Sequence, residues 1–440
     1  MLHRSGRPGS DKMEVARRKV ARVDEVSVKT ILFVGAALLL PVGVASAQSG
    51  KVCAVQQYGA KGDGSTLDTA AIQKAIDDCA ASGGGVVRLA GAANFVSAPL
   101  VLKSHITLEI AAGTTLEGST NHDDYLEIEQ FHDKGRQSLL SAMNAEDITI
   151  RGGGVIDGRG ESWWVNPHQT RPRLIVFDHC KHVVMENVTV ENSPMWQIVP
   201  YYSDDLTFRN MKVLAPLPAG HNTDGIDPFS SGNILIDHVT IDTGDDNVAI
   251  KSGQPGSPGP DAPSHDITIR DCVFLKGHGM SVGSEVAGGV QHVHVERVQF
   301  KGTTQGIRLK SGRDRGGDLS DFSYKDITME GVGTAIQITD YYGGDRAGAV
   351  TATTMPVTRL TARFDGIHIE NLKVTGAKVA MDVEGLPEAP IKNLVLDNVQ
   401  IQAAKAGKIF YAQVQSRGLK IMSADGEPLT VGTGVTGSLK

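Results

Sequence analysis

The chain has 440 residues, 51 of them glycine, with aromatic residues at only 5% and a formal net charge of −7. Abundant glycine and few aromatics argue against a helix bundle and favour many short strands joined by tight turns. The negative charge argues against nucleic acid as a partner, and it would repel a polyanion unless a local group of cations receives it.

Residues 1–47 have the pattern of an export signal. A basic segment precedes an apolar run, and a small-residue cleavage site ends at Ala47. Translation could begin at Met1 or at Met13, and an uncleaved membrane anchor is the alternative interpretation. After cleavage the chain would carry a net charge of −11, and no other stretch is apolar for long enough to span a membrane. We therefore expect a secreted protein with no membrane contact once the signal is removed.

All four cysteines follow the signal, so export would permit disulfides. Cys53 and Cys79 flank the first predicted helix and could close a short loop, which would stabilise the fold by roughly 3 kcal/mol. Cys272 occupies an apolar repeat position and is expected to be a buried thiol, whereas Cys180 has no evident partner. No cysteine–histidine spacing suggests zinc.

The first regular element is a helix with Asp68 as its N-cap and a glycine run, 83–85, at its end. Its apolar residues share one face: Ile72, Ala75, Ile76 and Cys79. The glycine-rich loop before it lacks the Gly-Lys-Ser/Thr ending of a phosphate-binding loop. Predicted strands follow at 86–89, 95–96 and 106–110.

From residue 183 onward an eight-residue pattern returns, with apolar residues at alternate positions and a polar residue at the fifth. Copies begin at Val183, Leu206, Ile234, Ile267, Val293, Phe322, Ile367 and Leu394. A period of 20–50 residues with no helix between the strands excludes a doubly wound sheet. It predicts a parallel β-helix in which successive turns stack, a single domain over 48–440 with the helix closing its N-terminal end. The 45-residue step after Phe322 predicts a loop insertion, and residues after about 405 should form a C-terminal cap.

The polar fifth position predicts a bend between two strands, because such side chains hydrogen-bond their own backbone. Stacked turns would let these side chains form a ladder of hydrogen bonds. The residues are Asn187, Asn210, His238, Asp271, Asp326, Asn371 and Asn398.

Four short motifs recur at about the same period. Asp224, Asp246, His278 and Arg308 follow one another at steps of 22, 32 and 30 residues. Residues one period apart in a solenoid lie on adjacent turns about 4.8 Å apart, so these side chains should converge, together with those of Asp245 and Lys310. Crowded carboxylates repel one another, and the pKa of at least one should rise. Turn-capping aspartates and a solvated basic face are the alternatives, and the shared register argues against both.

This set of residues fits the hydrolysis of a glycosidic bond, which needs a proton donor and a base for water. Carboxyl groups about 6.5–9.5 Å apart admit that water and invert the anomeric centre. The neighbouring cations indicate a substrate with negative charge, such as a uronic acid polymer.

At these residues the sequence closely resembles the polygalacturonases of glycoside hydrolase family 28. That family is marked by Asn-Thr-Asp, Asp-Asp, Gly-His-Gly and Arg-x-Lys in this order, which stand here at 222–224, 245–246, 277–279 and 308–310. The stretches around Asp224 and His278 look most like the bacterial secreted enzymes. The resemblance implies a right-handed β-helix and inverting hydrolysis of α-1,4-galacturonan, the polygalacturonate of pectin.

The resemblance also implies a role for each site residue. Asp245 would be the general acid, Asp224 and Asp246 would activate the water, and His278 would orient or tune the acid. Galacturonate would be bound by three residues of the motifs and one of the later loop: Asn222, Arg308, Lys310 and Tyr342. We expect no metal and no cofactor, and a monomer.

Two other functions share parts of this pattern. A pectate lyase has the same solenoid and substrate but eliminates with calcium, for which the aspartates could be ligands. A non-catalytic polysaccharide-binding β-helix has no need of three crowded carboxylates. Among hydrolases, the exo enzymes close one end of the groove with inserted loops; no large insertion is evident before residue 340, so we expect an open cleft and endo action.

Overall fold

The structure, a computed structural model, describes residues 50–131, 133–166, 168–215, 220–254, 262–343 and 348–439. The expected signal segment, with both candidate start residues, lies outside the described residues. Those from residue 50 onward form one compact unit. Within the described part of the chain, no helix is both long and apolar enough to cross a lipid bilayer.

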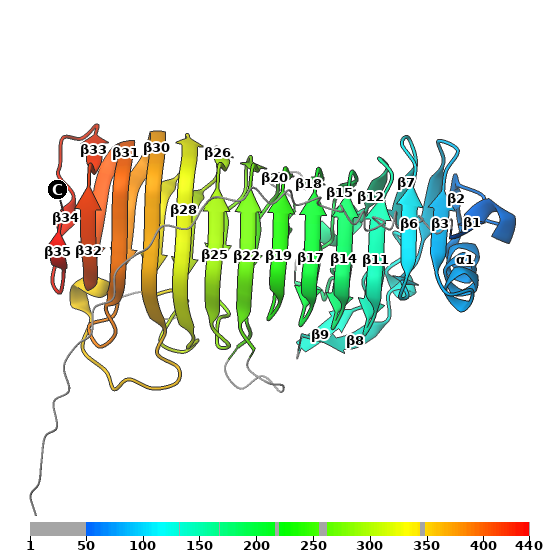
Figure 1. The fold of residues 1–440 in the computed structure, drawn as a ribbon, viewed down its shortest axis with the longest axis horizontal. Helices are drawn as coiled ribbons and strands as arrows, with labels where there is room; N and C mark the ends of the chain where they lie inside the picture. The colour runs from blue at the N-terminus through cyan, green and yellow to red at the C-terminus, as the bar shows by residue number, and fades with distance from the viewer. Residues whose placement is uncertain are drawn as a thin grey trace, which may run out of the picture. The chain divides into compact units, whose positions relative to one another are not determined.

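The chain winds into a right-handed parallel β-helix, as predicted, with each strand paired to its counterpart one turn later (Figure 1). The strands form three strips that run along the solenoid. The first strip holds β1 (Lys51–Ala54), β3 (Gly85–Leu89), β6 (Ile106–Ile110), β11 (Glu146–Arg151), β14 (Lys181–Glu186), β17 (Asp204–Arg209), β19 (Gly232–Asp237), β22 (Ser264–Arg270), β25 (Val290–Glu296), β32 (Ala412–Arg417) and β35 (Thr436–Ser438).

The second strip holds β2 (Asp63–Leu67), β4 (Asn94–Ser97), β7 (Thr115–Gly118), β12 (Val155–Asp157), β15 (Thr189–Glu191), β18 (Lys212–Leu214), β20 (Thr240–Asp242), β23 (Val273–Phe274), β26 (Gln299–Lys301) and β33 (Lys420–Ser423). The third holds β5 (Leu100–Val101), β10 (Leu140–Met143), β13 (Ile175–Asp178), β16 (Ile198–Tyr201), β21 (Val248–Ile250), β24 (Met280–Val282), β27 (Gln305–Lys310), β29 (Thr334–Thr339) and β34 (Thr430–Val431). Longer strands pass from strip to strip: β28 (Asp318–Glu330), β30 (Arg363–Glu384) and β31 (Ile391–Phe410).

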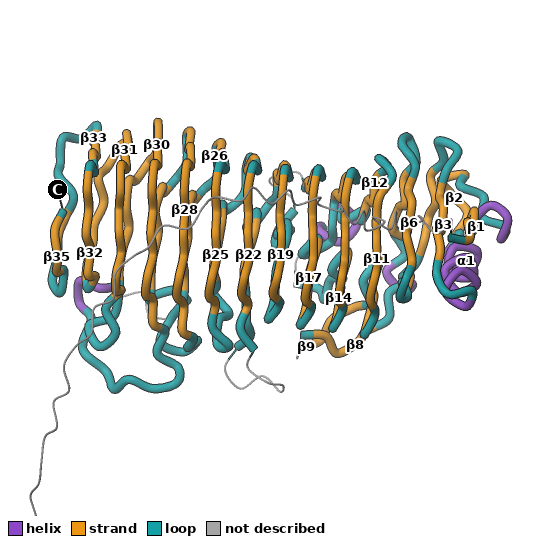
Figure 2. The backbone as a smooth tube through the Cα atoms, viewed as in Figure 1, coloured by secondary structure: helices purple, strands orange, loops and turns teal. Residues whose placement is uncertain are grey.

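Few elements interrupt the strands (Figure 2). They are the antiparallel hairpin of β8 (Glu127–Gln130) and β9 (Asp133–Arg136), the helices α1 (Thr69–Ala81) and α2 (Glu161–Trp164), and the 3-10 turns η1 (Val55–Tyr58), η2 (His122–Asp124) and η3 (Ala349–Thr351). The predicted insertion after Phe322 is confirmed as the loop between β29 and β30. The prediction that the strand repeat ends at about residue 405 is wrong, because short strands continue the stack to Ser438.

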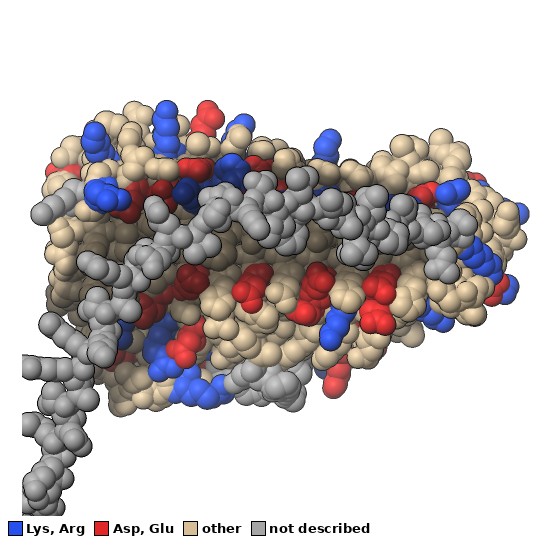
Figure 3. Space-filling model, in the orientation of Figure 1, with Lys and Arg blue, Asp and Glu red and all other residues tan. Residues whose placement is uncertain are grey.

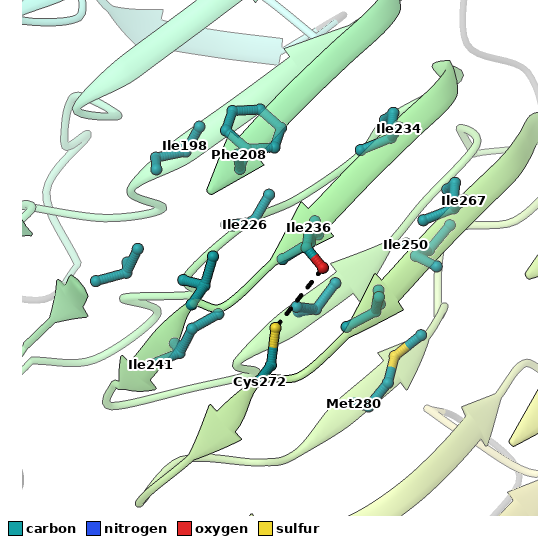
Figure 4. Packing of buried hydrophobic residues seen from close by; sticks show 14 of the residues in the cluster. Ile198, Phe208, Ile226, Ile234, Ile236, Ile241, Ile250, Ile267, Cys272 and Met280 are labelled. Atoms are coloured by element: carbon teal, nitrogen blue, oxygen red, sulfur yellow. Dashed lines mark hydrogen bonds between the residues drawn. The ribbon is translucent and has the colours of Figure 1, made fainter. Parts of the chain in front are cut away.

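The interior is a single column of apolar side chains from all three strips. Alternation within each strand turns residues such as Ile234 and Ile236 inward, and the register places like residues above one another, for example Ile234 and Ile267 (Figure 4). Cys272 is confirmed as a buried thiol whose Sγ lies 3.7 Å from the carbonyl oxygen of Ile236. Cys180 is also a buried free thiol.

The N-terminal end of the column is covered by α1, whose predicted apolar face is buried. The Cys53–Cys79 disulfide is confirmed and ties this helix to β1. Asp68 precedes the helix as predicted, but its side chain does not cap it. Its backbone is not extended (φ −88°, ψ 2°), and its carboxylate instead accepts hydrogen bonds from the backbone N–H groups of Lys61 and Gly62, at 2.7 and 2.9 Å.

The predicted bend residues all lie in the left-handed region, with φ from 50° to 56°. Asparagine, aspartate and histidine tolerate that conformation better than most residues. The expected ladder forms at the C-terminal turns, where Asn398 donates to Asn371 and Asn371 donates to Asp326, each at 2.8 Å. A second corner row starts the first strip, with φ from 52° to 62°: His105, Asp147, His182, Asp205, Asn233, Asp266, His292 and Asp321. Figure 3, drawn in the orientation of Figure 1, shows acidic side chains spaced along the length of the solenoid.

Over most of its length, the end of the first strip carries charges that alternate in sign from turn to turn. The row reads Arg88, Glu109, Arg151, Glu186, Arg209, Asp237, Arg270, Glu296, Lys325 and Glu370. The alternation ends at the next pair, where Glu370 faces Asp397. Ion pairs form along it, such as Arg209–Glu186 at 2.7 Å and Arg270–Asp237 at 3.1 Å. Each exposed pair contributes little by itself, but opposite charges directly across neighbouring strands favour this register over one that places like charges together.

Candidate active site

The predicted site residues lie at the start of the third strip. Ile226 bridges to Val248, and Val248 pairs with Met280, so Asp224, Asp246 and His278 occupy one position on three successive turns, as predicted. The next step is shorter: Met280 pairs with Ile307, which puts Arg308 in register with Ser281 and not with His278. The predicted 30-residue register is therefore wrong at this step, because this turn is three residues shorter than the spacing of the motifs.

The long side chains of Arg308 and Lys310 reach back over that offset to Asp246. This buried carboxylate accepts from Lys310 Nζ at 2.7 Å, from Arg308 Nη1 at 3.2 Å and from Ser281 Oγ at 2.6 Å. A carboxylate this far from water needs such partners. The two cations predicted to bind substrate are thus paired with an acid of the site.

Asp245 also faces the site, although it is adjacent to Asp246 and strand alternation alone would turn it away. A Cβ at Gly244 would lie 1.9 Å from the carbonyl oxygen of Gly220, so only glycine fits the tight turn that brings both aspartates to one side. Asp245 Oδ1 lies 2.9 Å from His278 Nδ1. Asp245 Oδ2 accepts from Asn222 Nδ2 at 3.3 Å. Asn222, Asp245, Asp246 and His278 therefore lie close together.

Their environments push the carboxyl pKa values apart. Burial raises the pKa of Asp224 well above its usual range, and the charges of Asp227 and Asp245 add to this. Burial also acts on Asp245, but the hydrogen bond and charge of His278, with Lys310 nearby, outweigh it and lower that pKa to about 2. Separated pKa values of this kind are typical of acid–base sites.

Tyr342 lies where the resemblance suggested. Its ring is about one third exposed, and its centroid is 5.5 Å from Arg308 Cζ and 5.2 Å from Lys310 Nζ. The ring thus covers the two cations from the loop side.

The sequence analysis gave no role to several charged residues of the site. Asp227 is wholly buried, and neither of its carboxylate oxygens has a hydrogen-bond partner among the described residues. Lys251 is buried with Nζ 3.3 Å from Glu285 Oε2, and burial is outweighed by the neighbouring acids, which raise the pKa of Lys251. One signal was available: Lys251 directly follows β21 and Lys310 ends β27, in the tripeptides Ala-Ile-Lys and Arg-Leu-Lys.

Arg171 was also missed, and no motif marks it. Its buried guanidinium donates to the carbonyl oxygens of Pro194 and His221, at 2.9 and 2.6 Å, and to Asn222 Oδ1 at 2.8 Å. It therefore fixes the Asn222 amide so that its N–H points at Asp245.

The donor set does not suit calcium. Asp245, Asp246 and His278 offer three ligand atoms within 4.8 Å of one another. Calcium takes six to eight oxygen ligands, whereas both oxygens of Asp246 already accept from cationic groups and the third donor is an imidazole. The cations beside this cluster would repel a metal ion.

Comparison with known proteins agrees with this geometry. Residues 83–416 match the model of the glycosyl hydrolases family 28. A probable polygalacturonase of Vitis vinifera is 29% identical over 439 residues, covering 90% of this chain and 88% of that protein. An endo-polygalacturonase of Pectobacterium carotovorum subsp. carotovorum is 36% identical over 306 residues, covering 64% and 74%.

Solved structures are similar too. The exopolygalacturonase of Thermotoga maritima superposes with a TM-score of 0.75 at 26% identity, over 84% of this chain and 91% of that one. The polygalacturonase of Erwinia carotovora ssp. carotovora gives 0.63 at 26% identity, over 88% and 97%. Because the family match spans most of the solenoid and all four motifs within it, the chain belongs to the glycosyl hydrolases family 28.

Proposed function

We propose that this protein hydrolyses the α-1,4-galacturonosyl linkages of polygalacturonate with inversion of the anomeric configuration. The observation that carries the proposal is that three aspartates, one histidine and two cations lie together on one side of the solenoid. Relatives named polygalacturonase over most of the chain support it.

The proposed acid is Asp245, whose carboxylate is hydrogen-bonded to His278. His278 and Lys310 lower the pKa of Asp245 to about 2, so a change in its surroundings must accompany its work as an acid. A galacturonate carboxylate that binds Arg308 and Lys310 brings negative charge beside Asp245 and engages a cation that now lowers its pKa. The pKa of Asp245 then rises, so its carboxyl can hold a proton and deliver it to the glycosidic oxygen.

The proposed water site lies between Asp224 and Asp246. Asp224 is buried, and its Oδ1 has no hydrogen-bond partner among the described residues, so this oxygen is available to a water. Three donors, Ser281, Arg308 and Lys310, hold the Asp246 side chain in place. Asp224, whose pKa is raised, is suited to take the proton that the attacking water loses.

Substrate binding is assigned to Asn222, Arg308, Lys310 and Tyr342. Arg308 offers a fork that fits a carboxylate, and Lys310 a compact charge. We further propose that the protein is exported by a cleavable signal at 1–47 and acts as a monomer without a cofactor. The sequence favoured internal cleavage of the polymer, which requires a groove open on both sides of the acids. The relatives do not decide between internal and chain-end cleavage, because they include an endo and an exo enzyme.

The test is incubation with polygalacturonate, with a neutral galactan as the comparison polymer. We expect new reducing ends only from the polyanion, and proton NMR of the first products should show the β-anomer before mutarotation. Asp245→Asn, which keeps the shape of the side chain, should lower kcat by about 10²–10⁴ while binding of oligogalacturonate persists.

Three outcomes would contradict the proposal. An initial α-anomer would mean a covalent intermediate. A calcium-dependent product that absorbs in the ultraviolet would indicate elimination. Binding of polygalacturonate with no new reducing ends would indicate a non-catalytic binding protein.

A further inference from the structure

The outward-facing row of the third strip forms the floor of the proposed site. Over the catalytic turns that floor is made of small residues, Ala249 and Ser281, which leave room above them. The same row continues toward the N-terminus through Asp227 to Val199 and Val176. A polymer that crossed the site would have to pass over these turns.

Large apolar side chains occupy those turns and are nevertheless buried. Val176, Val199, Tyr201 and Phe229 are only 2%, 0%, 7% and 6% exposed. They point out of the solenoid and form a cluster separate from its interior. Outward apolar side chains can be this inaccessible only where another segment covers them.

The cover is the β8–β9 hairpin together with Trp196. Phe131, at the tip of the hairpin, has its ring centroid 4.4 Å from that of Tyr201 and 5.8 Å from that of Phe229. The Trp196 ring lies 6.1 Å from that of Phe131, and Arg173 Cζ lies 4.1 Å and 4.5 Å from the same two rings. We call Phe131, Trp196, Tyr201 and Phe229 the aromatic plug.

The hairpin is anchored at its base and not merely laid on the surface. Arg136 donates to the carbonyl oxygens of Tyr125 and Thr170, at 2.7 and 3.2 Å. These bonds fix the end of β9 to the neighbouring loops, so the plug is part of the folded structure.

The opposite direction remains accessible along one row. Past Arg308 this row continues through Gln337, Asp382 and Lys408. The side chains of Asp382 and Lys408 are 27% and 36% exposed, whereas Thr339, Glu384 and Phe410 in the adjacent outward row are buried. Both outward rows are thus covered on the Asp224 side of the acids, and one of them is accessible on the Arg308 side.

The face of the plug nearest the acids is the ring of Trp196, which is partly exposed. Lys251 Nζ lies 4.9 Å from the centroid of this ring, but it is buried and paired with Glu285. A terminal sugar would therefore meet an aromatic ring there, with a buried cation behind it.

Resting on the proposed function, we propose that the aromatic plug makes this protein cut at the chain end: one terminus of polygalacturonate stops against Trp196, and a short product of fixed length is released. The expectation of endo action rested on the lack of a large insertion before residue 340, whereas the β8–β9 hairpin is a short antiparallel element outside the three strips.

The first experiment follows viscosity and reducing ends together during digestion of polygalacturonate. Chain-end cutting should release one short product from the earliest time points, with little loss of viscosity per bond cleaved. A rapid loss of viscosity with a ladder of intermediate oligomers would overturn the inference but leave the proposed function intact. A lack of any new reducing ends would overturn both.

A second experiment uses the unaltered protein and end-blocked oligogalacturonates, one set reduced at the reducing end and one set carrying a 4,5-unsaturated non-reducing end. One of the two blocks should slow release at least tenfold, and it identifies the terminus that meets the plug. Equal rates on blocked and unblocked oligomers would contradict chain-end recognition.

Phe131→Gly should open the plug, and glycine suits the local φ of 58°. We expect intermediate oligomers and a several-fold larger viscosity loss per bond cleaved. Leu126→Ala is the matched control, since this side chain lies near the hairpin, is 62% exposed and is not part of the plug. A Phe131→Gly protein that folds and still releases only the short product would refute a role for the hairpin.

Discussion

Asp227→Asn should make the protein more stable at neutral pH. Asp227 is wholly buried, and neither of its oxygens has a hydrogen-bond partner among the described residues. Burial raises its pKa well above the ordinary range, and the attraction of Lys251 opposes this only in part. The amide of asparagine has the same shape and carries no charge at any pH.

The size of the effect follows from proton linkage. An unfolded aspartate titrates near pH 3.9, whereas the folded carboxyl keeps its proton to higher pH, so stability falls by about 1.4 kcal/mol per pH unit between the two pKa values. From pH 4 to pH 7 the ceiling is about 4 kcal/mol. With an unfolding entropy of about 2.1 cal/mol/K per residue over about 390 residues, this ceiling corresponds to about 5 °C in Tm.

The assay is thermal unfolding of both proteins at pH 4, 5, 6 and 7 at one scan rate. The two melting temperatures should coincide near pH 4, where both states of the parent hold the proton, and diverge as the pH rises. Asp205→Asn is the control, because this aspartate is 61% exposed and its substitution should give no gap that grows with pH. If Asp227→Asn is less stable than the parent at pH 7, Asp227 is ionised and paired with Lys251, and the argument from burial fails.

Three further substitutions test other parts of the structure. His278→Ala removes the hydrogen bond and charge that lower the pKa of Asp245, so the limb of the kcat/KM profile that reports Asp245 should move to higher pH; an unchanged profile would leave the imidazole without a role in the acid. Lys310→Ala should raise KM more than it lowers kcat, and salt should weaken binding to the parent protein; an unchanged KM would mean that this cation serves only its ion pair. Replacing Cys53 and Cys79 together by serine removes a link across 26 residues and should lower the free energy of unfolding by about 3.5 kcal/mol, measured by denaturant unfolding; a loss below about 1 kcal/mol would contradict the loop-closure argument.

Periodicity predicted the solenoid because each turn must bury the same positions. Corner residues such as Asn187 and Asn210 were identified for the same reason, since every turn repeats the left-handed bend. The β8–β9 hairpin was missed because it belongs to no repeat. Phe131 is a lone aromatic in a polar segment, and only the folded chain shows that it packs on Tyr201 and Phe229.

The site could be predicted from the sequence only where its residues follow the repeat. Asp224, Asp246 and His278 could be aligned by the repeat, and the alignment holds as long as the turns keep their length. It failed at Arg308, where a shorter turn shifts the register. Arg171 was beyond sequence reasoning, because its contact with Asn222 spans 51 residues through loops that no period describes.

The charge row at the end of the first strip limits how this solenoid can change its length. If the turn that carries Arg209 were deleted, Glu186 would face Asp237, and like charges would meet across a strand pair. Deletion of two consecutive turns restores the alternation. Loss or duplication of turns in evolution or design should therefore be tolerated better in even numbers, and the thermal stability of chains shortened by one turn and by two would reveal this parity.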